Sequence, residues 1–359
     1  MNTKKKYFTT RLLQWNQKVN DRPMPWKGEK DPYKIWLSEI ILQQTRVEQG
    51  RDYYNRFVAA FPTIDKLAKA PQTKVFKLWE GLGYYTRCKN LIATAEIITK
   101  EYGGKFPGSY EAILNLKGVG PYTAAAIASF AYNLPYAVVD GNVFRVLSRF
   151  FENNTAIDSN EGKKIFTNLA NELLDTKLPG IYNQALMDFG AVVCKPKLPL
   201  CTQCALQSKC GAYVKGLVDI LPVKEKKITQ KVRWLFYFIV EHSGKVFVRK
   251  RGTKDIWENL YEFVLMETPA ATELEQLKKM PAFKKLLGNN AFTVEAISKL
   301  YSQKLTHQII HGQFIKVKLK EKALLEGYEL ASPRELATLP FPKFITTYLK
   351  DKNVSLNLL

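Results

Sequence analysis

The sequence predicts a mainly α-helical N-terminal half followed by a smaller α+β domain, and three observations indicate this fold class. From about residue 8 to residue 190, apolar residues recur at the three- and four-residue spacing of amphipathic helices. Four cysteines then lie close together near residue 200. Beyond a polar stretch at 222–233, the apolar pattern changes to the two-residue period of β-strands.

The composition limits the classes of function. The 359 residues carry a formal net charge of +21, with a pI near 9.6. Such an excess of Lys and Arg attracts polyanions, most often nucleic acid, although an ordinary basic surface is the alternative. The longest apolar run, Trp234–Val240, is far shorter than the roughly 20 residues of a membrane-spanning helix, and no apolar signal segment follows the N-terminus. We therefore expect a cytoplasmic protein that does not bind a membrane.

A glycine turn in the helical half is the most specific local motif after the cysteines. It reads Leu-Lys-Gly-Val-Gly-Pro-Tyr-Thr-Ala-Ala-Ala-Ile over 116–127. Gly118 and Gly120 allow backbone dihedrals that other residues avoid, and Pro121 suits the first turn of a helix. Bare N–H groups in such a turn, with Lys117 and Val119 beside the glycines, can bind one DNA phosphate without reading its sequence. An ordinary turn between two helices is the alternative.

Two carboxylates stand out because of their neighbours. Asp140 follows the apolar run 137–139 at the start of a predicted helix, where an Asp by itself is most often a helix cap. Glu39 lies between Leu37-Ser38 and the run 40–42, where apolar neighbours would raise its pKa and keep it protonated. A solvated surface charge is the ordinary interpretation of a lone Glu on a helix.

The cysteine spacing predicts a metal centre. Cys194, Cys201, Cys204 and Cys210 form a C-x6-C-x2-C-x5-C pattern. Thiolates this close in sequence are hard to pair as disulfides but converge readily on one metal site. We favour a [4Fe–4S] cluster, because the unequal spacing does not match two symmetric zinc knuckles, and a zinc site remains the alternative. The fifth cysteine, Cys88, is interpreted as a buried apolar thiol.

The C-terminal part is predicted to be α+β. Residues 234–240, a turn at 241–245 and residues 246–250 have the pattern of a β-hairpin. A further strand is expected at 314–319 and a helix at 333–339. We place the boundary between the two parts in a charged linker at 215–231.

The glycine turn, Asp140 and the cysteine loop together resemble the endonuclease III superfamily of helix-hairpin-helix DNA glycosylases, and within it the MutY-type adenine DNA glycosylases. The resemblance is strong over about 8–212 and weak over 232–350. Further matching motifs occur in the family's order at 25–26, 36–45, 81–85, 139–143 and 183–188.

The resemblance implies a domain plan. Residues 1–214 would form the glycosylase region, with a six-helix barrel over about 29–135 and an iron–sulfur cluster module made of 1–28 and 136–214. Residues 215–231 would be the linker. Residues 232–359 would form a Nudix-like domain that recognises 8-oxoguanine and lacks the acidic signature needed for pyrophosphate hydrolysis.

The resemblance also implies catalytic roles. The family's matching Glu, here Glu39, donates a proton to N7 of the flipped-out adenine. Asp140 would remain ionised and stabilise or capture the oxocarbenium-like sugar, with Asn142 in support. Tyr122 stands where strand-nicking relatives carry a Lys that forms a Schiff base. A phenol cannot do so, and we expect a monofunctional glycosylase in which Tyr122 positions the sugar or Asp140.

Other positions match the family's DNA contacts. Those around the adenine pocket are Arg22, Trp26, Lys27 and Asp188. Those that contact DNA near the lesion or grip its backbone are Gln44, Thr45, Leu82, Tyr84, Lys117, Gly118, Val119 and Gly120. In the C-terminal domain Leu305-Thr306-His307 aligns with the family's Phe-Ser-His loop, so Thr306 and His307 are the candidates for recognising 8-oxoguanine. The loss of the Phe puts the strength of that recognition in doubt.

These observations predict an enzyme that removes adenine mispaired with 8-oxoguanine or guanine from duplex DNA. It would be a monomer on the bacterial nucleoid in the cytoplasm. One alternative is an endonuclease III-like glycosylase and lyase for oxidised pyrimidines. A non-catalytic basic DNA-binding protein with a structural zinc knuckle is the other.

Overall fold

The computed structural model describes residues 3–225, 229–253, 255–288, 290–321 and 324–351. The chain divides into two compact parts. The first, the helical unit, comprises 1–69 with 90–226, and the second, the sheet unit, comprises 70–89 with 227–359. Residues 226–228 of the predicted linker lie outside the described residues. No helix in the described part of the chain is long and apolar enough to cross a membrane.

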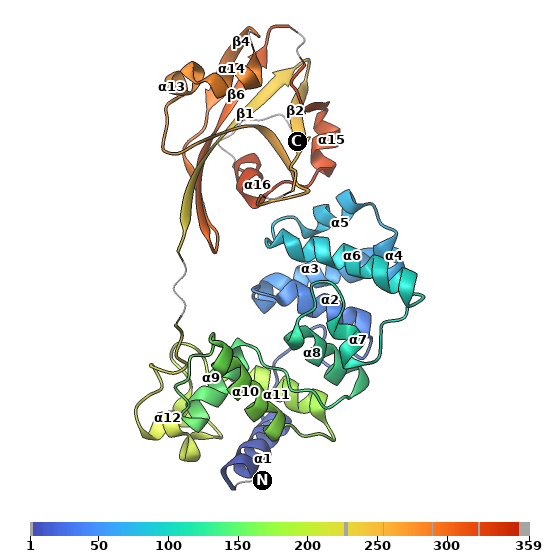
Figure 1. The fold of residues 1–359 in the computed structure, drawn as a ribbon, viewed down its shortest axis with the longest axis vertical. Coiled ribbons are helices and arrows are strands. Elements are labelled where there is room, and N and C mark those ends of the chain that lie inside the picture. The colour runs from blue at the N-terminus through green and yellow to red at the C-terminus, as the bar shows by residue number, and fades with distance from the viewer. Residues whose placement is uncertain (1–2, 226–228, 254, 289, 322–323, 352–359) are drawn as a thin grey trace. The chain divides into compact units, whose positions relative to one another are not determined.

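The helical unit confirms the prediction of a mainly α N-terminal half (Figure 1). Its helices are α1 (Thr3–Lys18), α2 (Pro32–Leu42), α3 (Val47–Ala60), α4 (Ile64–Ala68), α7 (Tyr110–Leu114), α8 (Pro121–Tyr132), α9 (Gly141–Phe151), α10 (Asn160–Leu173), α11 (Pro179–Val192) and α12 (Gly211–Val214). Two 3₁₀ turns, Cys201–Gln203 and Gln207–Lys209, shape the cysteine loop. Helix α6 (Tyr85–Glu101) begins in the sheet unit and continues into the helical unit.

Local chemistry sets where several of these helices begin. The side chains of Thr63, Ser109, Asp140 and Ser159 each accept a hydrogen bond from a backbone N–H in the first turn of the helix that follows. Such caps satisfy donors that have no partner within the helix. Pro occupies the first helical position of α2, α8 and α11, where its missing N–H carries no penalty.

The core of the helical unit reaches the cysteine loop. Phe8, Leu12 and Trp15 of α1 pack with apolar residues of α9, α10 and α11. Leu206 belongs to the same core, and the partly buried Cys194, Cys204 and Cys210 pack against it. Burial of this apolar surface therefore fixes the loop on the helices.

The described residues of the sheet unit form a seven-stranded sheet, in agreement with the α+β prediction. Its strands are β1 (Lys231–His242), β2 (Lys245–Lys250), β3 (Tyr261–Thr268), β4 (Phe292–Ile297), β5 (Tyr301–Lys304), β6 (Gln308–Leu319) and β7 (Glu329–Ala331). The order is β4-β6-β1-β3-β2-β7, with β5 paired to β6. Only the β1–β6 pair is parallel among these described strands.

The predicted hairpin at 234–250 is confirmed, since β1 and β2 pair antiparallel across a tight turn. Ser243 and Gly244 both have positive φ, as a two-residue hairpin turn of this kind requires. The expected strand at 314–319 lies within β6, and the expected helix at 333–339 is α15 (Pro333–Thr338).

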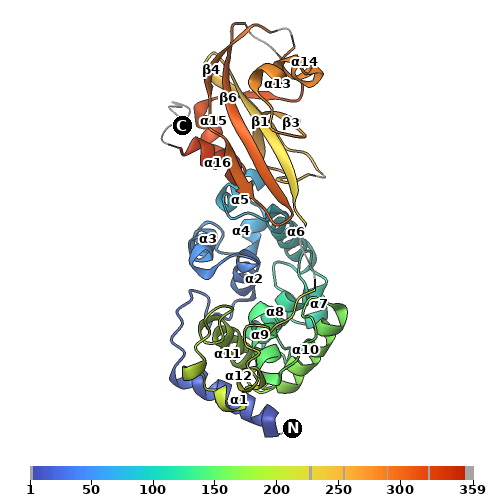
Figure 2. The same ribbon diagram turned by 90° about the vertical axis from the view of Figure 1, so that its left-hand side faces the viewer.

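Helices cover both faces of the sheet (Figures 1 and 2). Helices α13 (Leu274–Lys279) and α14 (Pro281–Leu287) pack on the face that carries Phe236 and Phe238 of β1. On the opposite face, Tyr237 and Phe314 stack on each other and contact aromatic residues of α16 (Lys343–Leu349). The alternation of side chains along β1 thus builds two separate apolar layers.

Residues 70–89 belong to the sheet unit. They comprise α5 (Gln72–Trp79), the loop 80–84 and the first turn of α6. The six-helix barrel expected over 29–135 therefore includes a segment that packs with the C-terminal sheet and its helices.

Candidate active site and cysteine cavity

Glu39 is a buried acid on an almost wholly buried helix. Only 5% of its surface is exposed, and its neighbours on α2 from Ile35 to Ile41 are buried too. The pKa of Glu39 is raised to about 7, chiefly by burial and also by the charge of Asp140, while a hydrogen bond from Tyr122 opposes the shift. A carboxyl with this pKa holds a proton at neutral pH that it can also release.

Tyr122 extends from the first turn of α8 and donates its hydroxyl hydrogen to Glu39. Burial, with the nearby Glu39 and Asp140, raises the pKa of this phenol well above its ordinary value. The phenol therefore stays protonated and remains a hydrogen-bond donor. The structure thus brings Glu39, Tyr122 and Asp140 together from α2, α8 and the start of α9.

The glycine turn before α8 is accessible on its outer side. Lys117 and Gly118 are exposed, whereas Val119 is buried. Gly118 has a φ of +78°, and a Cβ there would lie 2.7 Å from atoms of Asn90. The Lys117 carbonyl accepts a hydrogen bond of 2.7 Å from Thr94, which fixes the turn on α6. This turn needs glycine for both its backbone conformation and its close packing.

Asp140 caps α9, as the ordinary interpretation of that residue expected, and both of its oxygens have donors. One oxygen accepts from the Val143 backbone N–H at 2.8 Å, and the other accepts from Asn142 Nδ2 at 2.7 Å. Burial raises the pKa of Asp140, and these hydrogen bonds together with the charge of Arg145 oppose that shift. The donors and the N-terminus of α9 favour the ionised form.

Arg145 connects this acid to the cysteine loop, a link that the sequence interpretation missed. Its guanidinium donates to Asn142 Oδ1 at 2.8 Å, to the Gly190 carbonyl at 2.7 Å and to the Cys194 carbonyl at 2.7 Å. The available signal in the sequence was an Arg between the apolar residues Phe144 and Val146, and in the fold this Arg is only 7% exposed. Its partners become apparent only after folding.

A cavity of about 240 Å³ opens beside Glu39. Of the four residues predicted around an adenine pocket, Trp26 and Lys27 line this cavity. Gln184 of α11 also lines it and was not predicted. The signal for Gln184 was its place one turn before Asp188 on the same helix, because residues four apart lie on one helix face.

Asp188 is fully buried and contacts two of the lining residues. Its carboxylate pairs with Arg22 at 2.8 Å and with Lys27 at 3.3 Å, and it accepts from Gln184 Nε2 at 3.0 Å. Asn20 Nδ2 donates to it as well, at 2.9 Å. Arg22 and Asp188 therefore fix the cavity wall through Lys27 and Gln184.

The residues predicted to contact DNA near the lesion fall in both units. Gln44 and Thr45 follow α2 in the helical unit, where Gln44 is exposed with a φ of +57°. Leu82 and Tyr84 belong to the sheet unit, where Leu82 is buried and Tyr84 is 44% exposed. In that unit the Tyr84 hydroxyl lies 2.9 Å from Thr306 Oγ1. His307 is exposed.

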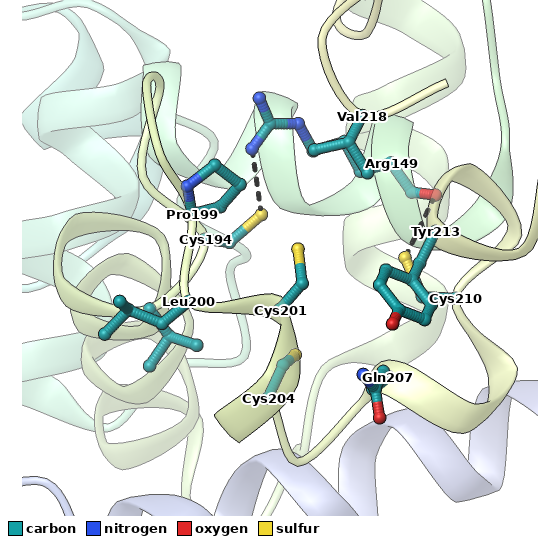
Figure 3. A pocket seen from close by; sticks show the side chains of 11 residues that line it. Arg149, Cys194, Pro199, Leu200, Cys201, Cys204, Gln207, Cys210, Tyr213 and Val218 are labelled. Carbon is teal, nitrogen blue, oxygen red and sulfur yellow. Dashed lines mark hydrogen bonds between the residues drawn. The ribbon is translucent and has the colours of Figure 1, made fainter. Parts of the chain in front are cut away.

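The four clustered cysteines line one cavity together with Arg149, and Figure 3 shows the sulfur atoms of Cys194 and Cys201 pointing toward one another. Arg149 Nη1 donates to Cys194 Sγ at 3.5 Å, and the Cys210 thiol donates to the Arg149 carbonyl at 3.6 Å. Cys88 lies elsewhere and is fully buried.

This cavity suits a thiolate-bound metal group. Burial raises the pKa of Cys201 and Cys210, and that of Cys204 to about 12, so the bare thiols would keep their protons at neutral pH. A bound cation that supplies positive charge would hold them as thiolates. Among the described residues, no three His, Cys, Asp or Glu side chains already have the arrangement of ligands around a single ion. Four cysteines around one space fit the donor set of an iron–sulfur cluster.

Comparison with known proteins gives two family matches. Residues 37–172 match the model of the HhH-GPD superfamily of base excision DNA repair proteins, and residues 236–351 match the NUDIX domain model. The first range contains Glu39, the glycine turn and Asp140. The second range confirms that the C-terminal domain has a Nudix-like fold.

Curated relatives match over most of the chain. The adenine DNA glycosylase of Buchnera aphidicola subsp. Baizongia pistaciae is 38% identical over 258 residues, which are 71% of this chain and 73% of that protein. The adenine DNA glycosylase of Buchnera aphidicola subsp. Acyrthosiphon pisum is 32% identical over 96% of this chain and 98% of that protein. The mouse adenine DNA glycosylase is 40% identical over 60% of this chain and 44% of that protein.

Solved structures agree for the helical half. A thermostable thymine-DNA glycosylase is 32% identical, with a TM-score of 0.55, and matches 60% of this chain and 98% of its own. An endonuclease III in a non-covalent DNA complex has a TM-score of 0.52 at 20% identity over 60% of this chain and 99% of its own, which shows a shared fold. The resemblance predicted from the sequence is thus confirmed, and the chain belongs to the adenine DNA glycosylase family.

Proposed function

We propose that this protein removes adenine mispaired with 8-oxoguanine, or with guanine, from duplex DNA and leaves the DNA strand intact. The observation that carries the proposal is Glu39, a buried acid with a pKa of about 7 that lines a cavity and is hydrogen-bonded to Tyr122. A base inside a duplex cannot reach a buried acid, so the adenine must be flipped out into the cavity.

The chemistry divides between the two acids. Glu39 delivers its proton to N7 of the flipped adenine, which makes the base a better leaving group. Asp140, with three groups that favour its charge, stabilises the positive charge that develops on the sugar or captures it until water arrives. Tyr122 offers a protonated phenol and no amine, so this position supplies no Schiff base and no strand cleavage.

The surrounding residues support binding of damaged DNA. The exposed backbone at Gly118 can bind a phosphate, and the net charge of +21 attracts the polyanion. Tyr84 would fill the gap in the base stack, while Thr306 and His307 would contact 8-oxoguanine. Two carboxylates and one cavity in a single chain would suffice for the reaction, so we propose a monomer that works on the chromosome in the cytoplasm.

We further propose that Cys194, Cys201, Cys204 and Cys210 bind a [4Fe–4S] cluster. When bound, the cluster would hold the cysteine loop in one shape. Arg145 links this loop to Asn142 and so to Asp140. The loop thereby supports the orientation of the acid.

One assay tests the proposal. A duplex with adenine opposite 8-oxoguanine is incubated with the protein, and the products are separated with and without alkali. We expect strand cleavage only after alkali. Cleavage without alkali would instead support the strand-nicking alternative, and intact DNA under both conditions would support a non-catalytic DNA-binding protein. Asp140→Asn, which keeps a capping oxygen, serves as the inactive control.

A further inference from the structure

The loop that carries Tyr84 has an unusual backbone. Gly81, Gly83 and Tyr84 have φ values of +90°, +79° and +49°. Glycine adopts positive φ readily, whereas a tyrosine rarely does. A non-glycine residue persists in this conformation only where its surroundings determine it. The contacts of the loop 80–84 therefore indicate what places Tyr84.

Some of these contacts come from the neighbouring helices. Trp79 Nε1 donates to the Gly83 carbonyl at 2.9 Å, and Arg87 donates to the same oxygen at 3.3 Å. The Arg87 guanidinium also lies 5.3 Å from the centre of the Tyr84 ring. These contacts shape the loop from residues next to it in the sequence.

Glu80 supplies a fixed point at the start of the loop. Its Oε1 accepts a hydrogen bond of 2.8 Å from the backbone N–H of Phe341. Lys77 Nζ lies 3.2 Å from the Glu80 carboxylate and donates to the Leu339 carbonyl at 2.9 Å. Lys77 and Glu80, at the C-terminal end of α5, thus each bond the backbone of the chain segment 339–341.

The segment 339–341 is itself anchored in the C-terminal core. Phe341 is 2% exposed and stacks on Phe263 of β3. The Pro340 carbonyl accepts from the Tyr261 backbone N–H at 2.8 Å. A partner held in this way cannot follow a moving loop, so the bond to Glu80 restrains the loop.

Two more contacts hold the C-terminal end of the loop 80–84 and the start of α6. The Tyr84 hydroxyl lies 2.9 Å from Thr306 Oγ1, and Lys89 pairs with Glu258 at 2.7 Å. Gln230 donates to the Leu305 carbonyl at 2.8 Å and restrains the turn that carries Thr306. The loop 80–84 is therefore held at both ends within the sheet unit.

We propose that Glu80 is a positioning residue, which holds the loop 80–84 through the Phe341 N–H so that Tyr84 is presented to DNA in one conformation. This inference rests on the proposed function only where it assigns DNA as the target of Tyr84. The sheet unit then has two tasks. It carries the candidate 8-oxoguanine contacts at Thr306 and His307, and it keeps the Tyr84 backbone in its strained conformation.

The test compares Glu80→Ala with Glu80→Gln, and uses Glu326→Ala as the control because Glu326 is exposed in the same unit. The alanine loses the acceptor for Phe341, whereas the glutamine keeps an oxygen there. We expect hydrogen exchange of the amides at 81–85 to rise about tenfold in Glu80→Ala and to stay within about threefold of the parent in Glu80→Gln and Glu326→Ala. This measurement needs no DNA.

The second readout uses the damaged duplex. We expect Glu80→Ala to bind DNA containing adenine opposite 8-oxoguanine about tenfold more weakly, with little change in the single-turnover excision rate at saturating enzyme. Unchanged exchange at 81–85 would overturn the anchoring role, and faster exchange with unchanged DNA affinity would overturn the positioning role. If Glu80→Ala does not fold, Glu80→Asp takes its place with the same expectations, because it keeps the charge beside Lys77 while its shorter side chain draws the acceptor away from the Phe341 N–H. Failure of the parent protein to excise adenine would count against the proposed function, and the exchange result would still decide the anchoring.

Discussion

Two buried glutamates, one in each unit, have opposite surroundings. Glu262 of β3 is 1% exposed and pairs with Arg249 at 2.8 Å and also with Arg251. Glu39 of α2 is 5% exposed and has no ion pair among the described residues, only the hydroxyl of Tyr122 and the like charge of Asp140. A buried charge is tolerated when it is paired, and an unpaired acid becomes neutral instead.

The ion pairs of Glu262 suit a role in stability, whereas the unpaired and protonated Glu39 suits a role in proton transfer. Glu262 is paired with two cations, so its charge is compensated within the sheet unit. Glu39 keeps a proton near neutral pH at a cost to folding. Residues that reduce stability in this way are most often retained for function, which supports the catalytic role proposed for Glu39.

The largest expected effect is on excision by Glu39→Gln. Gln has nearly the same shape but no proton to donate, so we expect the excision rate to fall about 10²–10⁴-fold while mismatch binding persists. In the parent protein the rate should decline as pH rises through about 7, because Glu39 then loses its proton. Single-turnover kinetics from pH 5 to 9 measure both effects. Retained activity in the variant would remove Glu39 from its role as the acid.

The matched change in the sheet unit is Glu262→Gln. It leaves Arg249 and Arg251 facing a neutral amide, and we expect the free energy of unfolding to fall by about 3–5 kcal/mol. Excision should be altered only through the loss of folded protein. Urea unfolding monitored by tryptophan fluorescence gives the value. A free energy of unfolding equal to that of the parent would mean that the ion pairs of Glu262 with Arg249 and Arg251 do not stabilise the sheet.

Glu39→Gln should have the opposite effect on stability. The folded pKa of Glu39 is about 7 and its ordinary value is 4.5, so between these pH values the folded state holds a proton that the unfolded chain has released. The free energy of unfolding of the parent therefore falls as pH rises through this window, by about 3 kcal/mol in all. Glu39→Gln has no carboxyl at this position, so its free energy of unfolding does not fall in this way. We expect it to gain stability relative to the parent at pH 8 and to show no such gain at pH 4, as measured by urea unfolding at both.

The sequence predicted the two acids, Tyr122 and the four cysteines because each lies in a short local motif. It did not predict Arg145 or Gln184. Arg145 bonds the carbonyl of Gly190, which is 45 residues away, and Gln184 lines the same cavity as Glu39, which is farther still along the chain. Helical periodicity shows that a face is buried but not what buries it. For that reason the grouping of residues 70–89 with the sheet unit, and the bond between Glu80 and Phe341, required the structure.

The smallest expected effect concerns Asp188 and the choice of base. Gln184 lines the cavity and donates from Nε2 to Asp188, and because a carboxylate only accepts hydrogen bonds, we expect the Gln184 carbonyl oxygen to be the amide atom that meets a bound base. A carbonyl oxygen can accept from the amino group of adenine but not from the oxygen that hypoxanthine carries in its place.

Asp188→Asn would let the Gln184 amide take either orientation. We expect the ratio of adenine to hypoxanthine excision to fall about tenfold, and the ratio cancels any general loss of activity caused by unpaired Arg22 and Lys27. Asn20→Ala is the matched control. It removes a different hydrogen bond to Asp188 and leaves the bond between Gln184 and Asp188 in place. A ratio that is unchanged in Asp188→Asn would show that Gln184 is oriented by other contacts or does not meet the base.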